Sequence, residues 1–179
     1  MDPRYLPPHY LTENSGMTGG GNPDTMIKNQ SYIMKKTIVI GSDHAGYQMK
    51  QKVIQALNDD YEFVDVGTNS EDSTDYPIYA KKVGEYIQQN PGTQGVLLCG
   101  NGVGITMAAN KMKGIRAALA YSKESAQQTR QHNDANVVAV GGRSPMMDDP
   151  VDIVQAFLAT EFSGEERHLR RVKQIMELE

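Results

Sequence analysis

The sequence predicts an α/β protein: a doubly wound, five-stranded parallel sheet with helices on both faces. Two observations lead to this prediction. From Lys36 onward, short apolar runs rich in β-branched residues alternate with segments of helical spacing. The runs are apolar throughout instead of alternating with polar residues, which is typical of parallel strands covered on both sides. Five strands joined by right-handed crossovers favour the order 2-1-3-4-5.

Five segments are predicted to be strands because they are short, apolar and bounded by glycine or a polar turn. The first is a β-branched run that ends at Gly41, the second ends at Gly67, and the fifth ends at Gly141. The third leads directly into the only cysteine, and the fourth follows Gly114. In chain order they cover residues 37–40, 62–66, 95–98, 116–120 and 135–140.

Six segments are predicted to be helices. The first carries Met49 and Val53 at helical spacing, and the second carries Val83 and Ile87. The third is stopped by Gly114, and the fourth is polar along most of its length. In chain order they cover residues 47–57, 78–87, 103–112, 123–131, 151–159 and 165–178.

Residues 1–33 differ from the rest of the chain. They contain four prolines and the run Gly19-Gly20-Gly21, with no apolar periodicity. This composition indicates a disordered extension, a leader added for expression, or an upstream start. Met34 has the context of a natural start, so residues 34–179 are the one predicted domain.

Composition excludes several classes of function. The formal net charge of -4 argues against a general binder of nucleic acid or of anionic membranes. No apolar run approaches the ~20 residues of a membrane span, and no signal-peptide core follows Met1. One cysteine cannot form an internal disulfide, so nothing requires an oxidising compartment. We expect a cytoplasmic protein.

Cys99 begins a glycine-rich loop between the third predicted strand and the third predicted helix. Backbone N–H groups in such a loop bind anions and stabilise a thiolate, so Cys99 is a candidate base or nucleophile. The alternative is a small apolar residue at the end of a core strand. The loop lacks the Lys-Ser/Thr of a Walker loop and the spacing of a dinucleotide loop. Its sequence is Cys99-Gly100-Asn101-Gly102-Val103-Gly104.

The predicted topology adds weight to the functional interpretation of Cys99. In the order 2-1-3-4-5, ligands bind outside the carboxyl ends of strands one and three. Strand one is followed by Asp43 and His44, and strand three by Cys99. Taken alone, Asp43 would be a helix N-cap and His44 a surface loop residue. Because the two strand ends meet at one crevice, we expect these side chains to line a single site.

Four more residues could bind or react with a ligand, and three of them have a plain alternative. His132 lies near a helix C-terminus, where an imidazole also interacts with the helix dipole. Arg143 follows the fifth strand at the same carboxyl edge. Arg167 and Arg171 are four residues apart and could bind a phosphate, or could form a solvated face with nearby glutamates. The single cysteine and dispersed histidines give no metal-ligand spacing.

The globular part, from Lys35 to Glu177, resembles the type B ribose-5-phosphate isomerases, within the wider family that includes galactose-6-phosphate isomerase subunits. Nine short motifs in register carry the resemblance. They are Gly41-Ser42-Asp43-His44-Ala45-Gly46, Asp65-Val66-Gly67-Thr68, Thr74-Asp75-Tyr76-Pro77, Cys99-Gly100-Asn101-Gly102-Val103-Gly104-Ile105, Ala108-Ala109-Asn110-Lys111, Gly114-Ile115-Arg116-Ala117, Arg130-Gln131-His132-Asn133-Asp134-Ala135-Asn136, Gly141-Gly142-Arg143 and Arg167-His168.

The resemblance implies an aldose–ketose isomerase that acts on a sugar phosphate without a metal or other cofactor. A proton would move between C1 and C2 through an enediolate, with ribose 5-phosphate and ribulose 5-phosphate as the expected pair. Cys99 would be the base, the amides of Gly100–Gly104 would stabilise the oxyanion, and His132 would open the furanose ring.

The resemblance also implies how the substrate is held. Family members are dimers or tetramers whose sites take residues from both subunits, so the last helix is expected to contact a partner subunit. The implied substrate-binding residues, first for the sugar and then for the phosphate, are Asp43, Asn133 and Tyr76, then His44, Arg143, Arg167 and Arg171.

One residue departs from the family pattern. Many members have Thr, and some Ser, where this chain has Asn101, and an amide is a poor proton shuttle. Asn101 therefore either orients the intermediate or signals another substrate, such as allose 6-phosphate, galactose 6-phosphate or a tetrulose 4-phosphate. A non-catalytic sugar-phosphate binding protein and a nucleotide-binding module are the alternatives from other classes.

Overall fold

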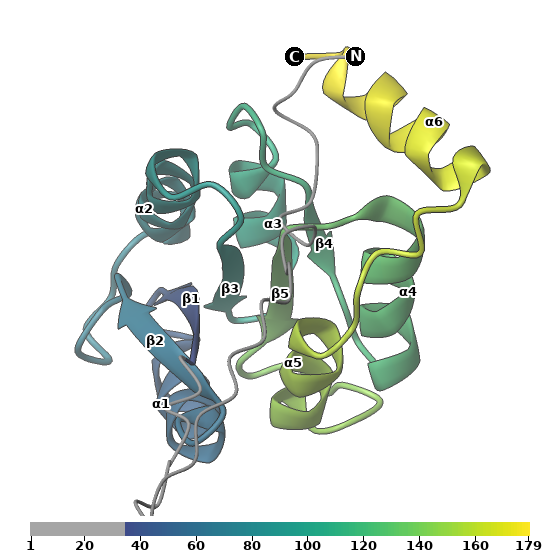
Figure 1. Cartoon of the computed structure of the whole chain (residues 1–179). Helices are drawn as coiled ribbons and strands as arrows, with labels where there is room; N and C mark the ends of the chain where they lie inside the picture. Colours follow the sequence, from purple (N-terminus) through teal and green to yellow (C-terminus); the bar gives the residue numbers. More distant parts are fainter. Residues whose placement is uncertain (1–34) are drawn as a thin grey trace, which may run out of the picture. The chain divides into compact units, whose positions relative to one another are not determined.

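Five parallel strands form one sheet with helices on both faces (Figure 1). The computed structural model of the protein describes residues 35–179, and the predicted extension 1–33 lies outside the described residues. The strands are β1 (Lys36–Ser42), β2 (Tyr61–Asp65), β3 (Gln94–Cys99), β4 (Ala117–Leu119) and β5 (Val137–Gly141). The helices are α1 (Tyr47–Leu57), α2 (Tyr76–Gln89), α3 (Val103–Ala109), α4 (Lys123–Asn133), α5 (Pro150–Leu158) and α6 (Glu166–Met176).

The order of the strands is β2-β1-β3-β5-β4, so the predicted order 2-1-3-4-5 is wrong for its last two strands. The reason is burial. All five residues of β5 are buried, whereas the three residues of β4 are only half-buried. The longer apolar strand takes the interior position beside β3, and the short strand forms the edge, where short strands are typical.

The position of β5 between β3 and β4 also decides which face of the sheet α4 covers. Right-handed crossovers put α1 on one face, and α2 and α3 on the other. Because the chain turns back from β4 to β5, α4 joins α1 and α5 instead of α2 and α3. Two clusters of buried side chains show these two layers. The first includes Ile40, Val53, Leu98, Ala126, Val140 and Phe157. The second includes Val39, Val83, Leu97, Ile105 and Ala139.

Among the helix ends that differ from the sequence prediction, two have a local explanation or affect a site residue. Helix α3 stops at Ala109, three residues early, because the side chain of Asn110 pairs with both backbone groups of Ala117 at the free edge of β4 (2.8 Å each). Helix α4 continues to Asn133, two residues beyond the predicted end. His132 therefore belongs to the last turn of α4 and does not follow the helix.

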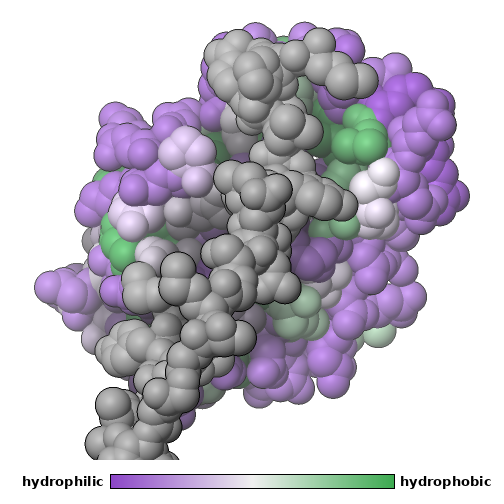
Figure 2. Space-filling view, in the orientation of Figure 1, coloured by the Kyte–Doolittle hydropathy of each residue, from purple (hydrophilic) through white to green (hydrophobic). Residues whose placement is uncertain are grey.

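The C-terminal helix α6 packs loosely on the rest of the chain. His168 is its only buried residue, and Leu169 and Ile175 are exposed. Figure 1 shows α6 beyond α4, away from α1 and α2. In the space-filling view the outer side of α6 is hydrophilic, and an apolar patch lies on the inner side, next to the rest of the chain (Figure 2). Within residues 35–179, no helix is long and apolar enough to cross a membrane.

Candidate active site

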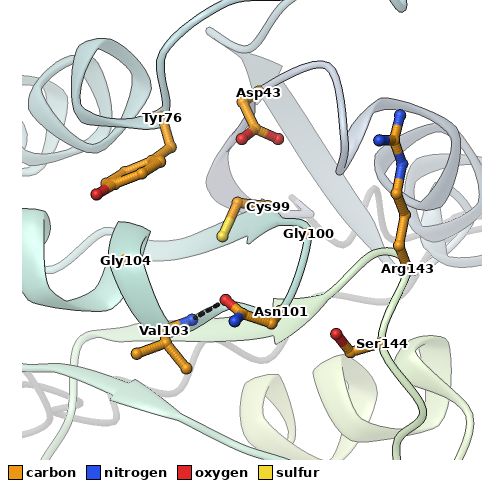
Figure 3. Close-up of a pocket in the computed structure, with 9 residues that line it drawn as sticks. All are labelled: Asp43, Tyr76, Cys99, Gly100, Asn101, Val103, Gly104, Arg143 and Ser144. Carbon is orange, nitrogen blue, oxygen red and sulfur yellow. Dashed lines mark hydrogen bonds between the residues drawn. The ribbon is translucent and has the colours of Figure 1, made fainter.

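A cavity of about 570 Å³ opens at the carboxyl ends of β1, β3 and β5 (Figure 3). This is the sheet edge at which the sequence placed the site, next to the β1–β3 switch point. Eight of the residues proposed from the sequence line the cavity, together with Ser144. The lining residues are Asp43, Tyr76, Cys99, Gly100, Asn101, Val103, Gly104, Arg143 and Ser144.

Cys99 is the last residue of β3 and is held from two sides. It pairs with Gly141 in the β3–β5 ladder, and its carbonyl oxygen accepts a hydrogen bond from the N–H of Gly142 (2.8 Å). The N–H of Gly102 donates to its Sγ (3.2 Å). Only 4% of the residue is exposed, and its sulfur faces the cavity. The thiol is therefore fixed at the cavity wall, with one backbone donor already directed at the sulfur.

The bend at Gly102 makes this contact possible. Its φ of +79° lies in the left-handed region, which favours glycine. A Cβ at this position would lie 2.5 Å from Cδ1 of Leu119 and 3.1 Å from the carbonyl carbon of Val140. Any larger residue would be strained and would have to displace its neighbours, so glycine is required here to place the N–H on the sulfur.

The five loop amides are not all available to a ligand. The N–H of Gly102 is occupied by Cys99, and the N–H of Val103 donates to Oδ1 of Asn101 (3.0 Å). Within residues 35–179, the N–H groups of Gly100, Asn101 and Gly104 have no acceptor. All five amides from Gly100 to Gly104 were expected to face the oxyanion. Only these three are available to do so.

The side-chain amide of Asn101 has a defined orientation. Its Oδ1 accepts from the Val103 N–H, drawn as the dashed line in Figure 3. A backbone N–H can donate only to the oxygen of the side-chain amide and not to its NH₂ group. The Nδ2 group is therefore the part of Asn101 that remains for a ligand. Within the described residues nothing accepts from Nδ2. Asn101 therefore offers the cavity a hydrogen-bond donor.

Asp43 faces the cavity from the end of β1 and is only 5% exposed. Its Oδ1 accepts from the N–H groups of Ala45 (2.9 Å) and Gly46 (3.0 Å). Helix α1 begins after Gly46, so the carboxylate caps the turn before the helix and not the helix itself. Its second oxygen, Oδ2, remains available to a hydroxyl of a ligand.

His44 does not line the cavity but organises one wall of it. Its Nδ1 lies 3.0 Å from the carbonyl oxygen and 3.2 Å from the N–H nitrogen of Thr74. This contact fixes the end of the long β2–α2 loop, two residues before Tyr76. The Tyr76 ring then packs so closely on Gly104 that a Cβ there would lie 2.7 Å from Cζ of the ring.

Lys50 supports the other end of the same loop, and sequence reasoning missed it because no motif marks it. It is 1% exposed and its Nζ donates to both carboxylate oxygens of Asp65 (2.6 and 2.8 Å) and to the carbonyl oxygen of Thr68 (2.7 Å). A buried lysine is tolerated only when its charge is paired and hydrogen-bonded in this way. The cation therefore fixes the start of the loop that delivers Tyr76.

Arg143 and Ser144 complete the cavity from the end of β5. Their N–H groups both donate to the carbonyl oxygen of Gly100 (3.0 Å each), which joins the β5 loop to the Cys99 loop. This contact exists because β5, and not β4, is the neighbour of β3. Sequence reasoning missed Ser144; its signal was its position directly after Arg143 at the same sheet edge.

The remaining candidates lie elsewhere in the chain. His132 and Asn133 are in the last turn of α4, at the edge where the strands begin. Helix α4 has 11 residues and is therefore about 16 Å long, which separates this turn from the cavity edge. Asn133 lines a second cavity of about 460 Å³. On α6, Arg167 pairs with Glu165 (2.8 Å) and Arg171 is exposed.

Within one chain, therefore, the predicted site exists as two groups of residues on different edges of the sheet. The first group surrounds Cys99 in the cavity. The second consists of His132, Asn133, Arg167 and Arg171. Within residues 35–179, no group of three or more His, Cys, Asp or Glu side chains is placed to hold a metal ion.

Comparisons with known proteins agree with this architecture. A family model described as Ribose/Galactose Isomerase matches residues 38–175. The chain is 41% identical over 145 residues to the ribose-5-phosphate isomerase B of Escherichia coli, covering 80% of this chain and 97% of that protein. It also superimposes on the solved structure of a ribose 5-phosphate isomerase from Thermotoga maritima with a TM-score of 0.75 and 45% identity, covering 79% of this chain and 98% of that one.

A second solved structure shows a ligand. It is ribose-5-phosphate isomerase B from Mycoplasma genitalium with ribulose 5-phosphate bound, similar at a TM-score of 0.75 and 38% identity. The match covers 81% of this chain and 97% of that chain.

Proposed function

The chain belongs to the ribose/galactose isomerase family, and on this premise we propose that it interconverts ribose 5-phosphate and ribulose 5-phosphate with Cys99 as the base. One observation supports the assignment most strongly. The Cys99 sulfur faces the same cavity as Asp43 and Arg143 and receives a backbone hydrogen bond from Gly102. Formation of ribulose 5-phosphate from ribose 5-phosphate in metal-free buffer tests the reaction.

In this proposal the thiolate of Cys99 removes the proton from C2 of the open-chain aldose. The bonding electrons form the C1–C2 double bond of an enediolate, and negative charge develops on the former carbonyl oxygen. Return of that proton to C1, together with transfer of the hydroxyl proton from O2 to O1, gives the ketose. The Gly102 N–H donates to the sulfur and holds it at the cavity wall, where the substrate carbon would lie.

The charge on the enediolate oxygens requires donors that are in place before the reaction begins. The available donors are the backbone N–H groups of Gly100, Asn101 and Gly104 and the Nδ2 group of Asn101. An amide donates a hydrogen bond but does not exchange protons readily. Asn101 therefore orients and polarises the substrate oxygens, and it does not carry a proton between them.

We assign the remaining polar groups of the cavity to substrate binding. Asp43 Oδ2 accepts from a sugar hydroxyl, and Tyr76 lines the sugar site. Arg143 is the cation of the cavity and binds the phosphate. His44 holds the Thr74 backbone in this chain, so its contribution to phosphate binding depends on its other ring nitrogen.

The second group of residues completes the site of another copy of the chain. His132 opens the furanose ring, Asn133 holds a hydroxyl, and Arg167 and Arg171 bind the phosphate. One chain cannot bring them to its own Cys99, because the length of α4 separates the two edges. We therefore propose a homodimer, alone or within a homotetramer, in which each site takes residues from both subunits.

The surface of the chain supports this assembly. Val103 and Met107 of α3 are 44% and 64% exposed beside the cavity, and Leu169 and Ile175 of α6 are 51% and 43% exposed. Apolar side chains of this size, grouped next to a polar site, are typical of a protein interface. A second copy that places its α6 near the cavity would cover both sets.

We place the enzyme in the cytoplasm, because a base that is a free thiol has to remain reduced. A panel of allose 6-phosphate, galactose 6-phosphate and a tetrulose 4-phosphate, beside ribose 5-phosphate, decides the substrate. Asn101 is the observation that makes the panel necessary. A tenfold preference for another sugar phosphate would make that compound the substrate. Cys99 would keep its role as the base.

A further inference from the structure

The two histidines at the end of α4 and the start of α6 are in direct contact. The ring centroids of His132 and His168 are 4.6 Å apart, with the rings inclined at 48°. His168 is 4% exposed, whereas His132 is exposed. One face of the accessible imidazole therefore rests on a buried ring, at a separation typical of packed aromatic pairs.

The same contact is reinforced by the loop between α5 and α6. Ser163 Oγ lies 2.9 Å from Nδ1 of His168. The N–H of Ser163 donates to the carbonyl oxygen of Gln131, the residue before His132 (3.2 Å). One serine thus holds the buried ring with its side chain and the last turn of α4 with its backbone, which fixes the two rings relative to each other.

We propose that His168 is a positioning residue that holds the His132 ring in the orientation needed to open the sugar ring. The inference rests on the proposed function, in which His132 moves the proton between O1 and O4 of the furanose. His168 itself does not touch the substrate in this account. It acts through His132, the exposed residue whose ring packs on its own.

The chemistry of the two sugars separates this role from the proton transfer at carbon. Ribose 5-phosphate is a cyclic hemiacetal and has to be opened before Cys99 can act. Ribulose 5-phosphate cannot form a furanose, because its O5 is esterified. Exchange of solvent deuterium into C1 of ribulose 5-phosphate therefore requires Cys99 but no ring opening. The ratio of the two rates reports on His132 alone.

The test compares His168→Leu with the wild type in both reactions. We expect kcat for ribose 5-phosphate to fall roughly tenfold or more, because a small displacement of a catalytic group has effects of that size. Deuterium exchange into ribulose 5-phosphate should stay within about twofold of wild type, below the effect expected for a displaced group. Loosening of α6 would raise KM for both sugars alike and would leave the ratio of the two kcat values unchanged.

Ser163→Ala keeps the proposal falsifiable if His168→Leu folds poorly, and two further comparisons test the coupling and provide a control. Ser163→Ala keeps both rings and should lower the same ratio to a smaller extent. Combining His168→Leu with His132→Asn should lower the ratio no further than His132→Asn alone, since one residue acts through the other. Gln174→Ala, at an exposed position of α6, is the control for substitutions in this helix.

Two results would overturn the proposal. The first is an unchanged ratio in folded His168→Leu and Ser163→Ala. The second is a ratio in the double variant equal to the product of the single effects, which would make the two histidines independent. Absence of both reactions in the wild-type protein would instead reject the proposed function.

Discussion

The N–H of Gly102 donates a hydrogen bond to the sulfur of Cys99, three residues earlier in the chain (3.2 Å). The two residues enclose a tight turn that is possible only because Gly102 adopts a φ of +79°. This turn directs a backbone N–H at the sulfur at the end of a buried strand. The chemistry proposed for Cys99 therefore depends on the conformation of a neighbour that has no side chain.

Replacing Gly102 with alanine should reduce both stability and turnover. A non-glycine residue in the left-handed region costs about 1–3 kcal/mol, and the added Cβ would press on Leu119 and Val140. Relaxation of that strain would move the N–H away from the Cys99 sulfur. We expect a lower midpoint of urea unfolding and a lower kcat, measured on the same preparation.

The control for this variant is Gly92→Ala. Gly92 has a φ of +91°, with nothing within 4 Å of its would-be Cβ, and it lies in the loop before β3. It should lose stability without losing turnover. Equal loss of kcat in the two variants would mean that the Gly102–Cys99 contact has no role in the reaction.

Asn101→Asp tests the donor assigned to the side-chain amide. The carboxylate still accepts from the Val103 N–H, so the turn is kept, but it presents an acceptor and a negative charge to the enediolate. Loss of one preorganised donor lowers kcat by about 10²–10³-fold in other enzymes, and repulsion should add to this. Asn101→Ala, which removes the donor without adding charge, should be affected less. Wild-type kcat in Asn101→Asp would show that the amide nitrogen is not used.

Arg171→Ala should raise the KM for ribose 5-phosphate and leave kcat nearly unchanged, because a phosphate is bound equally in the ground and transition states. Arg170→Ala is the matched control. On a helix of 3.6 residues per turn, Arg171 lies near the buried His168 side of α6, and Arg170 lies on the opposite side. A fall in kcat alone for Arg171→Ala would contradict its assignment to the phosphate.

The shared site predicts that two inactive variants restore each other. A mixed dimer of Cys99→Ser and His132→Asn has one site with both groups intact and one site with neither. Random mixing should recover roughly a quarter of wild-type activity, since about half of the dimers are mixed and each has one intact site. His132→Asn mixed with the double variant supplies no intact histidine and is the control. Absence of recovery, with mixed dimers demonstrated, would mean that each site is built from one chain.

Most of the fold could be predicted from the sequence because its signals are local. Glycine after an apolar run marks the ends of β1, β2 and β5, and helical spacing marks α1 and α2. The positions of β4 and β5 could not be predicted in the same way. Their exchange depends on which strand buries more surface between two layers of helices, and that comparison involves the whole sheet.

The residues of the candidate site also fall into those that a local sequence signal places and those that it does not. Asp43, Cys99 and Arg143 were placed together because each follows a strand at the carboxyl edge, and the cavity contains all three. His132 and Arg171 were assigned by resemblance, and one chain does not bring them to the cavity. Nor could sequence indicate that Gly102 and Val103 donate within the loop, because those bonds depend on the backbone conformation at one residue.

The most direct test of the account is deuterium exchange into C1 of ribulose 5-phosphate, in metal-free deuterated buffer, by wild type and Cys99→Ser. Serine keeps the size of the side chain but gives up its proton far less readily than a thiol. We predict rapid exchange by the wild type and a rate lower by about 10²–10⁴-fold in the variant, the range for loss of a general base. Ligand binding by the variant should be retained. Exchange by folded Cys99→Ser at the wild-type rate would contradict the assignment of Cys99 as the base.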